Sequence, residues 1–584
     1  MLKRLSKCIR EYMKYTAATP ILVTLEVIME VLMPLIMAQM IDKGIGTDDK
    51  PGSMKMIFIY GGLLLLCALL SMVFGGLAGK TAATASCGFA KNLRQDMFYR
   101  IQNFSFSNID RFSTAGLVTR LTTDVTNVQM AFQMLTRMTF RAPVMLVTAL
   151  IAAFSLNVRL SLIYLCVTPV LFGGLLLIIK FAHPIFTRVF KTYDKLNGAV
   201  GENLSGVRVV KSFNREDYET KKFKGISGGI FSDFVKAEKL IAFNFPLMNI
   251  CMYTCVILIS WFGAKFIVAS GNTDFTTGML TSFFTYNMQI LFSLMMISVV
   301  FVMMTISRAS AERIYEVFQE ESDIVNPDNP VTEVENGDIS FENVSFGYSR
   351  NASKKCLDNI NVTIKSGETV GILGATGSAK STFVSLIPRL YDAGEGVVKV
   401  AGRDVREYDI EALRDSVAMV LQKNVLFSGT IKENLRWGNA DATDEEIKRV
   451  CRLAQADGFI EAFPDKYDTY IEQGGTNVSG GQKQRLCIAR ALLKKPKILI
   501  LDDSTSAVDT KTDALIRQAF AEEIPDTTKI IIAQRVSSVM DADKIIVMDD
   551  GKIASMGTHE ELLENEPIYR EVYESQVKGG EENE

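Results

Sequence analysis

Residues 369–387, TVGILGATGSAKSTFVSLI, read as a buried strand, a glycine-containing loop and the start of a helix. The loop matches the phosphate-binding pattern at Gly374, Gly377, Lys380 and Ser381. In such a loop the backbone N–H groups and the helix N-terminus hold phosphates, lysine neutralises them, and the serine hydroxyl ligates Mg²⁺. The stretch therefore predicts an α/β nucleotide-binding domain around it.

Two further segments, C-terminal to this loop, carry the other groups that nucleotide chemistry needs. Residues 497–503, KILILDD, are apolar until Asp502 and Asp503, and a carboxylate at the end of a buried strand beside such a loop is placed to hold Mg²⁺. Residues 477–485, NVSGGQKQR, precede that strand and start a helix, so that a serine hydroxyl and helix N-terminal amides form a second anion site.

The first half of the chain has a different composition. Six stretches are long and apolar enough to cross a bilayer, since a spanning helix needs about 20 such residues. They lie near 18–41, 57–79, 135–156, 160–182, 246–269 and 278–305. We therefore expect a membrane all-α domain with six helices at 1–318, a linker at 319–338, and an α/β P-loop domain with a helical subdomain at 339–584.

The connections between these spans predict their orientation. The connections 80–134 and 183–245 are long and rich in Lys and Arg, whereas the other three are short and carry few cations. The positive-inside rule places the long connections, both termini and the nucleotide-binding domain in the cytoplasm of a multi-pass plasma-membrane protein. The long connections keep helical periodicity around polar breaks near 104–113 and 204–216, and the basic N-terminal segment is predicted to be an interfacial helix.

Three ionisable residues lie inside predicted spans. Glu26 and Glu30 share one face of the first span, and Arg141 lies in the third. A structural Glu–Arg pairing and a cation-attracting cavity wall are both open interpretations. The sixth span adds an adaptable, methionine-rich and aromatic surface that suits varied ligands. Its residues are Phe283, Phe284, Phe292, Met295, Met296, Phe301, Met303 and Met304.

Composition excludes other classes of protein. A net charge of −3 offers no basic footprint for nucleic acid. The nine cysteines show neither metal-ligand nor disulfide-framework spacing, so they are expected to be buried thiols.

Together these motifs resemble those of the ATP-binding cassette (ABC) exporters over nearly the whole chain. The resemblance implies that Tyr348 stacks on adenine, that residues 479–482 form the signature motif, and that residues 506–509 lie at a dimer interface. The breaks near 104–113 and 204–216 resemble coupling helices. The nucleotide-binding set so implied is Tyr348, Gly374, Ala375, Thr376, Gly377, Ser378, Ala379, Lys380, Ser381, Thr382 and Gln422, with Ser381, Gln422 and Asp502 as Mg²⁺ ligands.

Three positions depart from this family's pattern within one nucleotide site. Ala379 replaces a glycine, Asp503 stands where the family has its catalytic glutamate, and Gln534 stands where it has a histidine. Aspartate is one methylene shorter than glutamate, and a base misplaced by about 1 Å loses on the order of 10²-fold in rate. Glutamine still donates a hydrogen bond but holds no positive charge.

The signature motif, by contrast, is intact at Ser479, Gly480, Gly481 and Gln482. In this family each signature serves ATP bound by the partner chain. The expectation is therefore the degenerate-site subunit of a heterodimeric exporter of amphiphilic small molecules, paired with a non-identical half-transporter and using ATP and Mg²⁺. A nucleotide-sensing regulatory subunit, a slowly hydrolysing homodimer, and export of peptides or lipids remain alternatives.

Overall fold

The structure is a computed structural model of the whole chain, and it describes all residues except 48–49, 271, 273, 349–354, 505–506 and 582–584. The chain divides into two compact units. The helical unit comprises Met1–Asn103 and Ser113–Glu320, and the α/β unit comprises Phe104–Phe112 and Glu321–Glu584.

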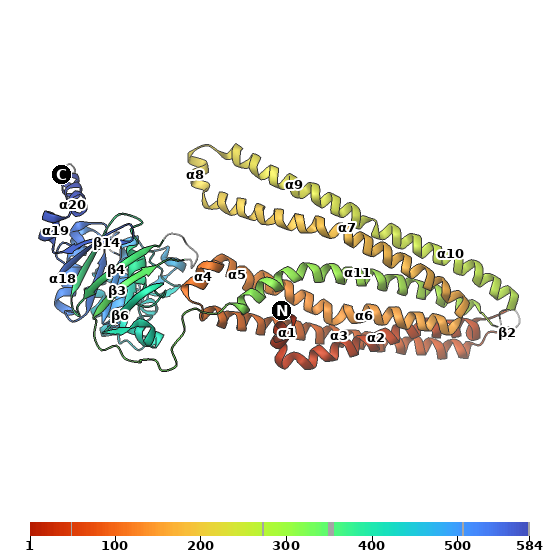
Figure 1. Cartoon of the computed structure of the whole chain (residues 1–584). Coiled ribbons are helices and arrows are strands. Elements are labelled where there is room, and N and C mark those ends of the chain that lie inside the picture. The colour runs from red at the N-terminus through yellow and green to blue at the C-terminus, as the bar shows by residue number, and fades with distance from the viewer. Residues whose placement is uncertain (48–49, 271, 273, 349–354, 505–506, 582–584) are drawn as a thin grey trace. The chain divides into compact units, whose positions relative to one another are not determined.

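The helical unit is built from long helices that run alongside one another (Figure 1). Within the described residues, six helical segments are long and apolar enough to cross a membrane, one over each of the six predicted spans, which confirms that prediction. The elements are α1 (Leu2–Leu5), η1 (Ser6–Tyr12), α2 (Met13–Met40), η2 (Ile41–Ile45), β1 (Gly46–Thr47), β2 (Lys50–Pro51), α3 (Met54–Gln102), α5 (Thr114–Thr119), η3 (Arg120–Asp124), α6 (Val125–Leu156), α7 (Val158–Ser205), α8 (Val207–Ser212), α9 (Glu216–Ala242), α10 (Asn244–Ser270) and α11 (Thr277–Gln319).

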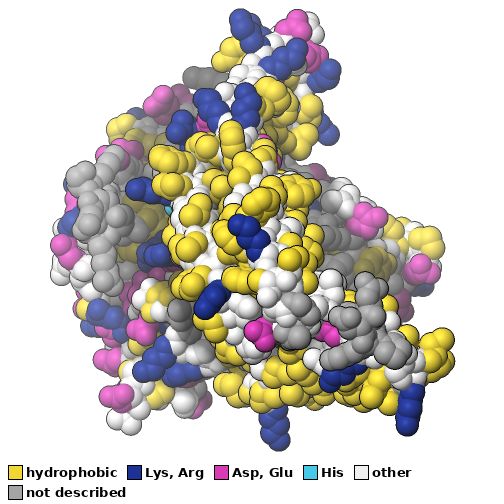
Figure 2. Space-filling model, turned by 90° about the vertical axis from the view of Figure 1, so that its right-hand side faces the viewer, with side chains coloured by type: hydrophobic (Ala, Val, Ile, Leu, Met, Phe, Trp, Pro, Cys, Tyr) yellow, Lys and Arg dark blue, Asp and Glu magenta, His cyan; other side chains and the backbone are white. Residues whose placement is uncertain are grey.

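The outward faces of these helices are apolar. Large hydrophobic side chains such as Phe58 and Met72 of α3 and Ile257 and Trp261 of α10 are exposed. Figure 2 shows hydrophobic side chains over much of the helix surface that faces the viewer, with few charged ones among them. An apolar surface of this extent on a folded unit marks an interaction with lipid or another apolar partner.

Several helices extend well beyond the length that a bilayer requires. α3 contains 49 residues and α7 contains 48, which corresponds to roughly 70 Å each at 1.5 Å per residue. The predicted polar breaks are short helices: α4 (Phe106–Phe112) follows α3, and α8 follows α7. The prediction of helical arms around these breaks is therefore confirmed.

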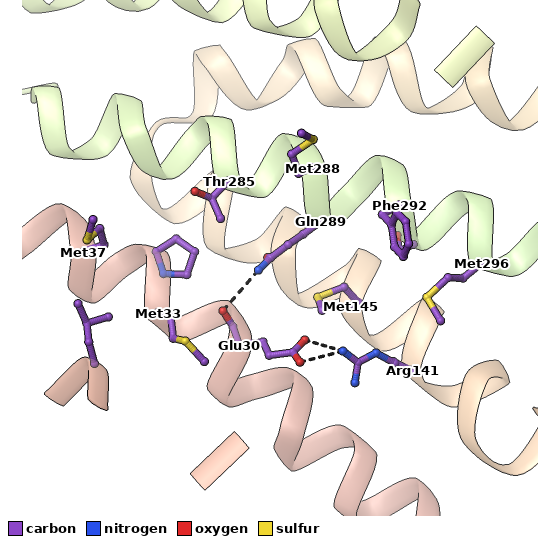
Figure 3. A pocket seen from close by; sticks show the side chains of 13 residues that line it. Glu30, Met33, Met37, Arg141, Met145, Thr285, Met288, Gln289, Phe292 and Met296 are labelled. Carbon is purple, nitrogen blue, oxygen red and sulfur yellow. Dashed lines mark hydrogen bonds and ion pairs between the residues drawn. The ribbon is translucent and has the colours of Figure 1, made fainter. Parts of the chain in front are cut away.

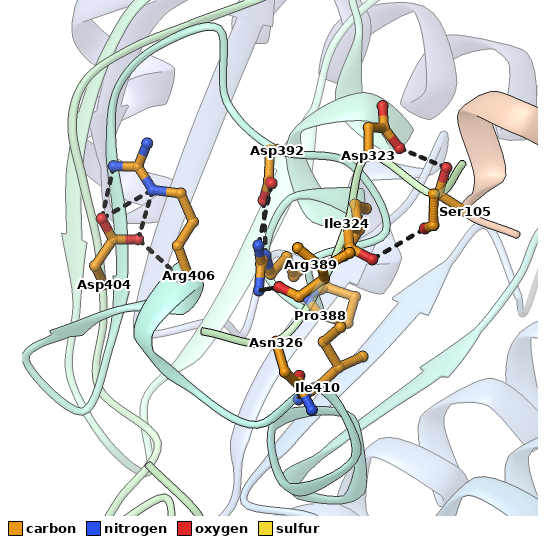
Figure 4. Close-up of polar contacts among 12 residues, drawn as sticks. Ser105, Asp323, Ile324, Asn326, Pro388, Arg389, Asp392, Asp404, Arg406 and Ile410 are labelled. Carbon is orange, nitrogen blue, oxygen red and sulfur yellow. Dashed lines mark hydrogen bonds and ion pairs between the residues drawn. The ribbon is translucent and has the colours of Figure 1, made fainter. Parts of the chain in front are cut away.

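The short helix α4 packs within the α/β unit. The Ser105 hydroxyl, just before the helix, donates a 2.6 Å hydrogen bond to Asp323 (Figure 4). The Tyr391 hydroxyl donates to Asp110 at 2.7 Å, and its ring lies 6.1 Å from that of Phe106. Burial and hydrogen bonding to Asp110 raise the pKa of Tyr391, so its hydroxyl stays a donor at neutral pH.

The segment after Glu320 is also held by side chains of the α/β unit. The Asn326 amide oxygen accepts from the Ile410 N–H at 2.9 Å, and its nitrogen donates to Asp409 at 2.6 Å. The buried Arg389 pairs with Asp392 and donates to the Val325 carbonyl at 3.2 Å (Figure 4). These bonds fix the path of the chain into the first strand of the unit.

The α/β unit contains a mixed six-stranded sheet and an antiparallel four-stranded sheet. Their orders are β14-β13-β5-β12-β11-β8 and β4-β3-β6-β7, and β5 lies parallel to both β12 and β13. The strands are β3 (Ile339–Phe346), β4 (Leu357–Ile364), β5 (Thr369–Leu373), β6 (Glu395–Val400), β7 (Arg403–Asp404), β8 (Val417–Val420), β9 (Gly429–Thr430), β10 (Tyr470–Ile471), β11 (Ile498–Asp502), β12 (Thr528–Ile532), β13 (Lys544–Asp549) and β14 (Lys552–Gly557).

Helices complete this unit. The helices are α12 (Lys380–Ser385), η4 (Val405–Glu407), α13 (Ile410–Ser416), α14 (Ile431–Leu435), α15 (Asp444–Leu453), α16 (Asp457–Glu461), η5 (Lys466–Asp468), η6 (Gln473–Gly475), α17 (Gly480–Leu493), α18 (Thr510–Glu523), η7 (Val536–Ser538), α19 (His559–Asn565) and α20 (Pro567–Glu581). One apolar core lies between the two sheets, and a second joins α14–α17 to the larger sheet, which is the predicted helical subdomain.

An ion pair between a half-exposed arginine and a buried aspartate ties α11 to the end of η3, just before α6. Asp124 is 0% exposed, and both of its carboxylate oxygens accept from Arg313, one at 2.8 Å from Nε. We expect Arg313→Met to destabilise the chain by about 1–3 kcal/mol, because the buried Asp124 carboxylate would lose the donors that Arg313 supplies. The measurement is the thermal unfolding midpoint of the purified chain in detergent.

The matched control is Arg308→Met on the same helix, since Arg308 forms an exposed pair with Glu312. Exposed pairs contribute about 0–1 kcal/mol, so this variant should unfold close to the native midpoint. Adding Asp124→Asn to Arg313→Met should recover part of the loss. Equal midpoints for the two arginine variants would contradict this assignment.

Candidate nucleotide-binding site

The larger sheet brings the predicted residues to one edge. The parallel strands β5, β12, β11 and β8 end side by side, and the loop 374–379 follows β5 directly. Asp502 is the last residue of β11, while Gln534 and Gln422 lie two residues beyond β12 and β8. Ligands bind at the carboxyl ends of strands in such sheets, so this edge is the candidate site.

The loop has the backbone geometry of a phosphate cradle. Gly374 and Gly377 have φ values of 151° and 90°, and a Cβ on Gly374 would lie 2.2 Å from the Met548 carbonyl oxygen. Ala379 has φ 70°, in the left-handed region that glycine tolerates best. A non-glycine residue there costs about 1–2 kcal/mol. The loop thus keeps its shape at the substituted position, at a cost in backbone strain.

Lys380 begins α12 and curls back over the loop. Its Nζ donates to the carbonyls of Gly374 and Ala375 at 2.8 and 2.9 Å. Burial lowers the pKa of Lys380, while the nearby carboxylates of Asp502 and Asp503 act in the opposite direction. A partly desolvated ammonium at the mouth of a cradle is suited to a phosphate oxygen, because Coulomb attraction strengthens as water is excluded.

Oxygen donors for a divalent ion lie beside this lysine. Burial raises the pKa of Asp502, and a hydrogen bond with the Ser381 side chain opposes that rise. No group of three or more His, Cys, Asp or Glu side chains that could enclose a metal occurs in the described part of the chain. The residues fit Mg²⁺, which binds through one or two protein oxygens and completes its shell with phosphate and water. Ser381, Asp502 and Gln422 would hold it.

Two glutamines converge on Asp503. The side-chain amides of Gln534 and Gln422 donate to the same oxygen, Oδ2, at 2.9 and 3.3 Å. An ionised carboxylate only accepts hydrogen bonds, which fixes both amides with their nitrogens toward it. Asp503 is 9% exposed with φ 48°. The carboxylate therefore accepts from two neutral amides, and no histidine is among the described residues that line the pocket.

Tyr348 forms one side of the pocket. Its hydroxyl lies 2.9 Å from the Thr382 hydroxyl, and its ring makes edge contacts with Phe346 and Tyr391. The side chain is 53% exposed, which leaves ring surface available for an aromatic base. The pocket has a volume of about 520 Å³, which is within the range of small-molecule sites.

Most of the predicted residues line this pocket, and some others were not predicted. The predicted lining residues are Tyr348, Thr376, Gly377, Ala379, Lys380, Ser381, Thr382, Gln422, Asp502, Asp503 and Gln534, and the unpredicted ones are Lys355, Cys356, Ile532, Asp550 and Gly551. Gly374, Ala375 and Ser378 belong to the loop but not to the lining. Among the missed residues, Asp550 and Gly551 carry a sequence signal, because an Asp-Gly pair is typical of a hairpin turn, and both have positive φ between β13 and β14.

The predicted signature motif lies outside that pocket. Ser479 caps α17: its Oγ accepts from Gln482 N–H at 3.3 Å, and the Gln482 side chain accepts from Ser479 N–H at 2.9 Å. Ser479 and Gly480 are exposed, and a Cβ on Gly481 would meet the Ala507 carbonyl at 2.8 Å. The helix N-terminus is therefore presented at the surface. Ser506 of the predicted interface loop lies outside the described residues.

Comparisons with known proteins agree with this arrangement. The family described as ABC transporter transmembrane region matches residues 17–295, and the family described as ABC transporter matches residues 357–506. The chain is 36% identical over 556 residues to YfiB of Bacillus subtilis, an uncharacterised ABC transporter ATP-binding protein, with 95% of each chain covered. It is 35% identical over 584 residues to an uncharacterised ABC transporter ATP-binding protein of Mycobacterium tuberculosis, covering 99% of this chain and 98% of the relative.

A solved structure shares the fold. The structure of a bacterial Atm1-family ABC exporter with ATP bound superimposes with a TM-score of 0.82 at 23% identity, covering 96% of this chain and 99% of that one. The predicted fold, six membrane helices fused to a P-loop domain, is thereby confirmed. With a phosphate cradle, a capped signature helix and full-length relatives, the chain belongs to the ABC transporter family and carries a membrane region and a nucleotide-binding domain on one chain.

Proposed function

We propose that this chain is the degenerate-site half of a heterodimeric ABC exporter of amphiphilic small molecules. Family membership supports ATP binding and ATP hydrolysis coupled to transport by a multi-pass membrane protein. The pairing, the division of labour between two ATP sites and the substrate class are our proposals. The observation that supports them is a contrast between two sites. In the Asp503 cluster, two glutamine amides donate to the carboxylate of Asp503, whereas the signature helix α17 keeps its capping box at Ser479.

The Asp503 cluster binds nucleotide but is poorly suited to activate water. The carboxylate is one methylene shorter than glutamate, and one of its oxygens is occupied by two amide donors. A general base must reach the proton that it removes with a free lone pair. Gln534 can donate a hydrogen bond to a phosphate oxygen but contributes no positive charge. Slow hydrolysis with retained binding is the expected result.

The signature helix is proposed to act on the partner's ATP. Ser479 and the first amides of α17 form an exposed helix N-terminus, which attracts phosphate through its unpaired N–H groups and dipole. The capping box between Ser479 and Gln482 rigidifies this end. A preorganised donor set supports fast hydrolysis in a site completed by a partner whose own P-loop and base are intact.

The orientation follows from charge. The long connections that carry most of the cations are proposed to lie in the cytoplasm, together with both termini and the α/β unit. We propose that residues 1–318 form the membrane domain, residues 319–338 the linker and residues 339–584 the nucleotide-binding domain. A plasma-membrane location in a bacterium accords with the bacterial relatives.

The pairing proposal makes a first prediction. Purified alone and reconstituted in lipid, the chain should show little ATPase activity, because its own site lacks a suited base. Co-expression with a related half-transporter that carries Glu and His at the two altered positions should yield a stable complex with robust ATPase activity. Strong cooperative ATPase activity from this chain by itself would overturn the proposal in favour of a homodimer.

A second prediction concerns the lifetime of bound ATP. Lys380, Ser381 and Asp502 are retained, so this chain's site should bind Mg-ATP and hold it over many turnovers of the complex. Photolabelling with a radioactive ATP analogue, followed by separation of the two chains, measures exchange at each site. In the complex, Lys380→Ala should abolish labelling of this chain and leave labelling of the partner unchanged. Equally fast exchange at both sites would show that ATP is not retained.

The third prediction contrasts Ser479 with Asp503. Ser479→Arg should reduce ATPase activity of the complex by about 10²–10³-fold, because a donor oriented toward transition-state charge is lost and bulk is added. Asp503→Asn should cost little, since hydrolysis at that site is already slow. The control Asp503→Glu with Gln534→His should partly revive the site. The assignment is wrong if Asp503→Asn proves as damaging as Ser479→Arg.

A further inference from the structure

A cavity lies among the membrane-spanning helices of the helical unit (Figure 3). Its volume is about 700 Å³, and its walls come from α2, α3, α6 and α11. Five methionines line it: Met33, Met37, Met145, Met288 and Met296. Together with Phe292 they form an apolar wall that can adapt to differently shaped ligands, because the methionine side chain is unbranched and polarizable. The volume suits a drug-sized molecule.

One end of the cavity carries an unequal set of charges. Arg141 pairs with both predicted acidic residues: its Nη1 lies 2.6 Å from Glu26 and its Nη2 lies 2.8 Å from Glu30. The predicted Glu–Arg pairing is therefore confirmed. Two carboxylates share this guanidinium, and among the described lining residues Arg141 is the sole cation. Arg137 lies one turn away on α6 beside Gly79, and it is not part of the lining.

The same end has more acceptors than donors. Glu26 is not part of the lining: it is 7% exposed and contributes only the negative charge that it shares through Arg141. The Ser293 hydroxyl donates to the Ile290 carbonyl at 2.7 Å and the Thr285 hydroxyl to the Thr281 carbonyl at 3.4 Å. Their hydrogens are thus used within the helix, and only lone pairs remain for the cavity.

Pro34 explains how the Gln289 side-chain amide is oriented. Pro34 has no N–H, so the Glu30 carbonyl one turn earlier lacks its usual helical donor. The Gln289 side-chain nitrogen donates to that carbonyl at 3.4 Å (Figure 3). This bond commits the nitrogen and leaves Gln289 Oε1 buried without a partner among the described residues. A buried acceptor of this kind destabilises the site unless a donor is supplied.

We propose that this cavity binds amphiphiles that carry a hydrogen-bond-donating cation, a primary ammonium or a guanidinium, next to an apolar body. This inference rests on the proposed export function and names its substrate class. The cationic head lies between Glu30 and Gln289, where it donates to the unpartnered Gln289 oxygen and offsets the negative charge that the two carboxylates hold in excess over Arg141. The apolar body lies against the methionines and Phe292.

An anionic head is disfavoured by the same contacts. The two terminal nitrogens of Arg141 are committed to Glu26 and Glu30, so an anion would have to break a desolvated ion pair before it gained a donor. It would also approach the Gln289 oxygen and two hydroxyl lone pairs. A neutral head without N–H groups would leave those acceptors unsatisfied.

The test compares two probes that differ only at the head. Dansylcadaverine carries a dansyl fluorophore and a primary ammonium, and its N-acetyl derivative is neutral at that end. Binding to the full-length chain in lipid nanodiscs without ATP is measured by fluorescence titration. The ammonium probe should bind at least about tenfold more tightly than the acetylated probe, as hydrogen bonds to charged groups predict.

Variants locate this preference. Glu30→Gln should reduce it to near unity, and Gln289→Met should reduce it several-fold, while the acetylated probe binds each variant as it binds the native chain. The matched control, Glu238→Gln, changes an exposed carboxylate on α9 and should alter neither affinity. The acetylated probe keeps one amide N–H but carries no charge, so its binding reports that the apolar wall of a variant is folded. If Glu30→Gln fails this check, Gln289→Met decides.

Two results would overturn the proposal: equal affinities of both probes for the native chain, or a preference that persists in Glu30→Gln and Gln289→Met. This experiment needs neither partner nor transport. A complex that fails to export any amphiphile while the chain keeps its ammonium preference would reject the export function alone. Export of neutral amphiphiles without an ammonium preference would reject only this inference.

Discussion

Peptide N–H and C=O groups in a hydrocarbon layer have only one another as hydrogen-bond partners, and long helices such as those of the helical unit satisfy them within a single segment. Side-chain hydroxyls in α2 and α6 obey the same constraint, because Thr24 and Thr148 donate to carbonyls one turn earlier on their own helices. α3 then continues as one unbroken helix to Gln102. The same helix therefore contains both a membrane span and a rigid arm, which ends shortly before α4.

In the α/β unit the corresponding constraint is the pairing of parallel strands. β5, β11, β12 and β8 contribute nearly continuous apolar segments, and each polar residue of the nucleotide site follows the point where a strand leaves the core. Strand pairing therefore places Lys380, Asp502 and Gln534 together although they lie far apart in the sequence. The departures at Ala379, Asp503 and Gln534 leave this framework unchanged and alter only the groups at its edge.

Features written in contiguous motifs could be predicted from the sequence: the six spans, the phosphate-binding loop, the strand-end aspartates and the capped helix at Ser479. The Glu–Arg pair was also predicted, because charges inside spans seek partners. Residues placed by tertiary packing were not. Lys355 and Gly551 line the nucleotide pocket although they lie far apart in the sequence. The Gln289 amide donates to the Glu30 carbonyl, which has no helical donor because Pro34, four residues after Glu30, lacks an N–H. No local periodicity encodes those neighbours.

The nucleotide site and the membrane cavity differ in how far their polar groups are satisfied. At Asp503 two glutamine amides already donate to one carboxylate oxygen. At the cavity, by contrast, the Gln289 side-chain oxygen has no protein donor among the described residues. Saturated polar groups make a site rigid, whereas unsaturated buried groups gain free energy when a ligand supplies what is missing. A ligand that donates a hydrogen bond to the Gln289 oxygen would therefore gain binding free energy that a ligand without a donor would not.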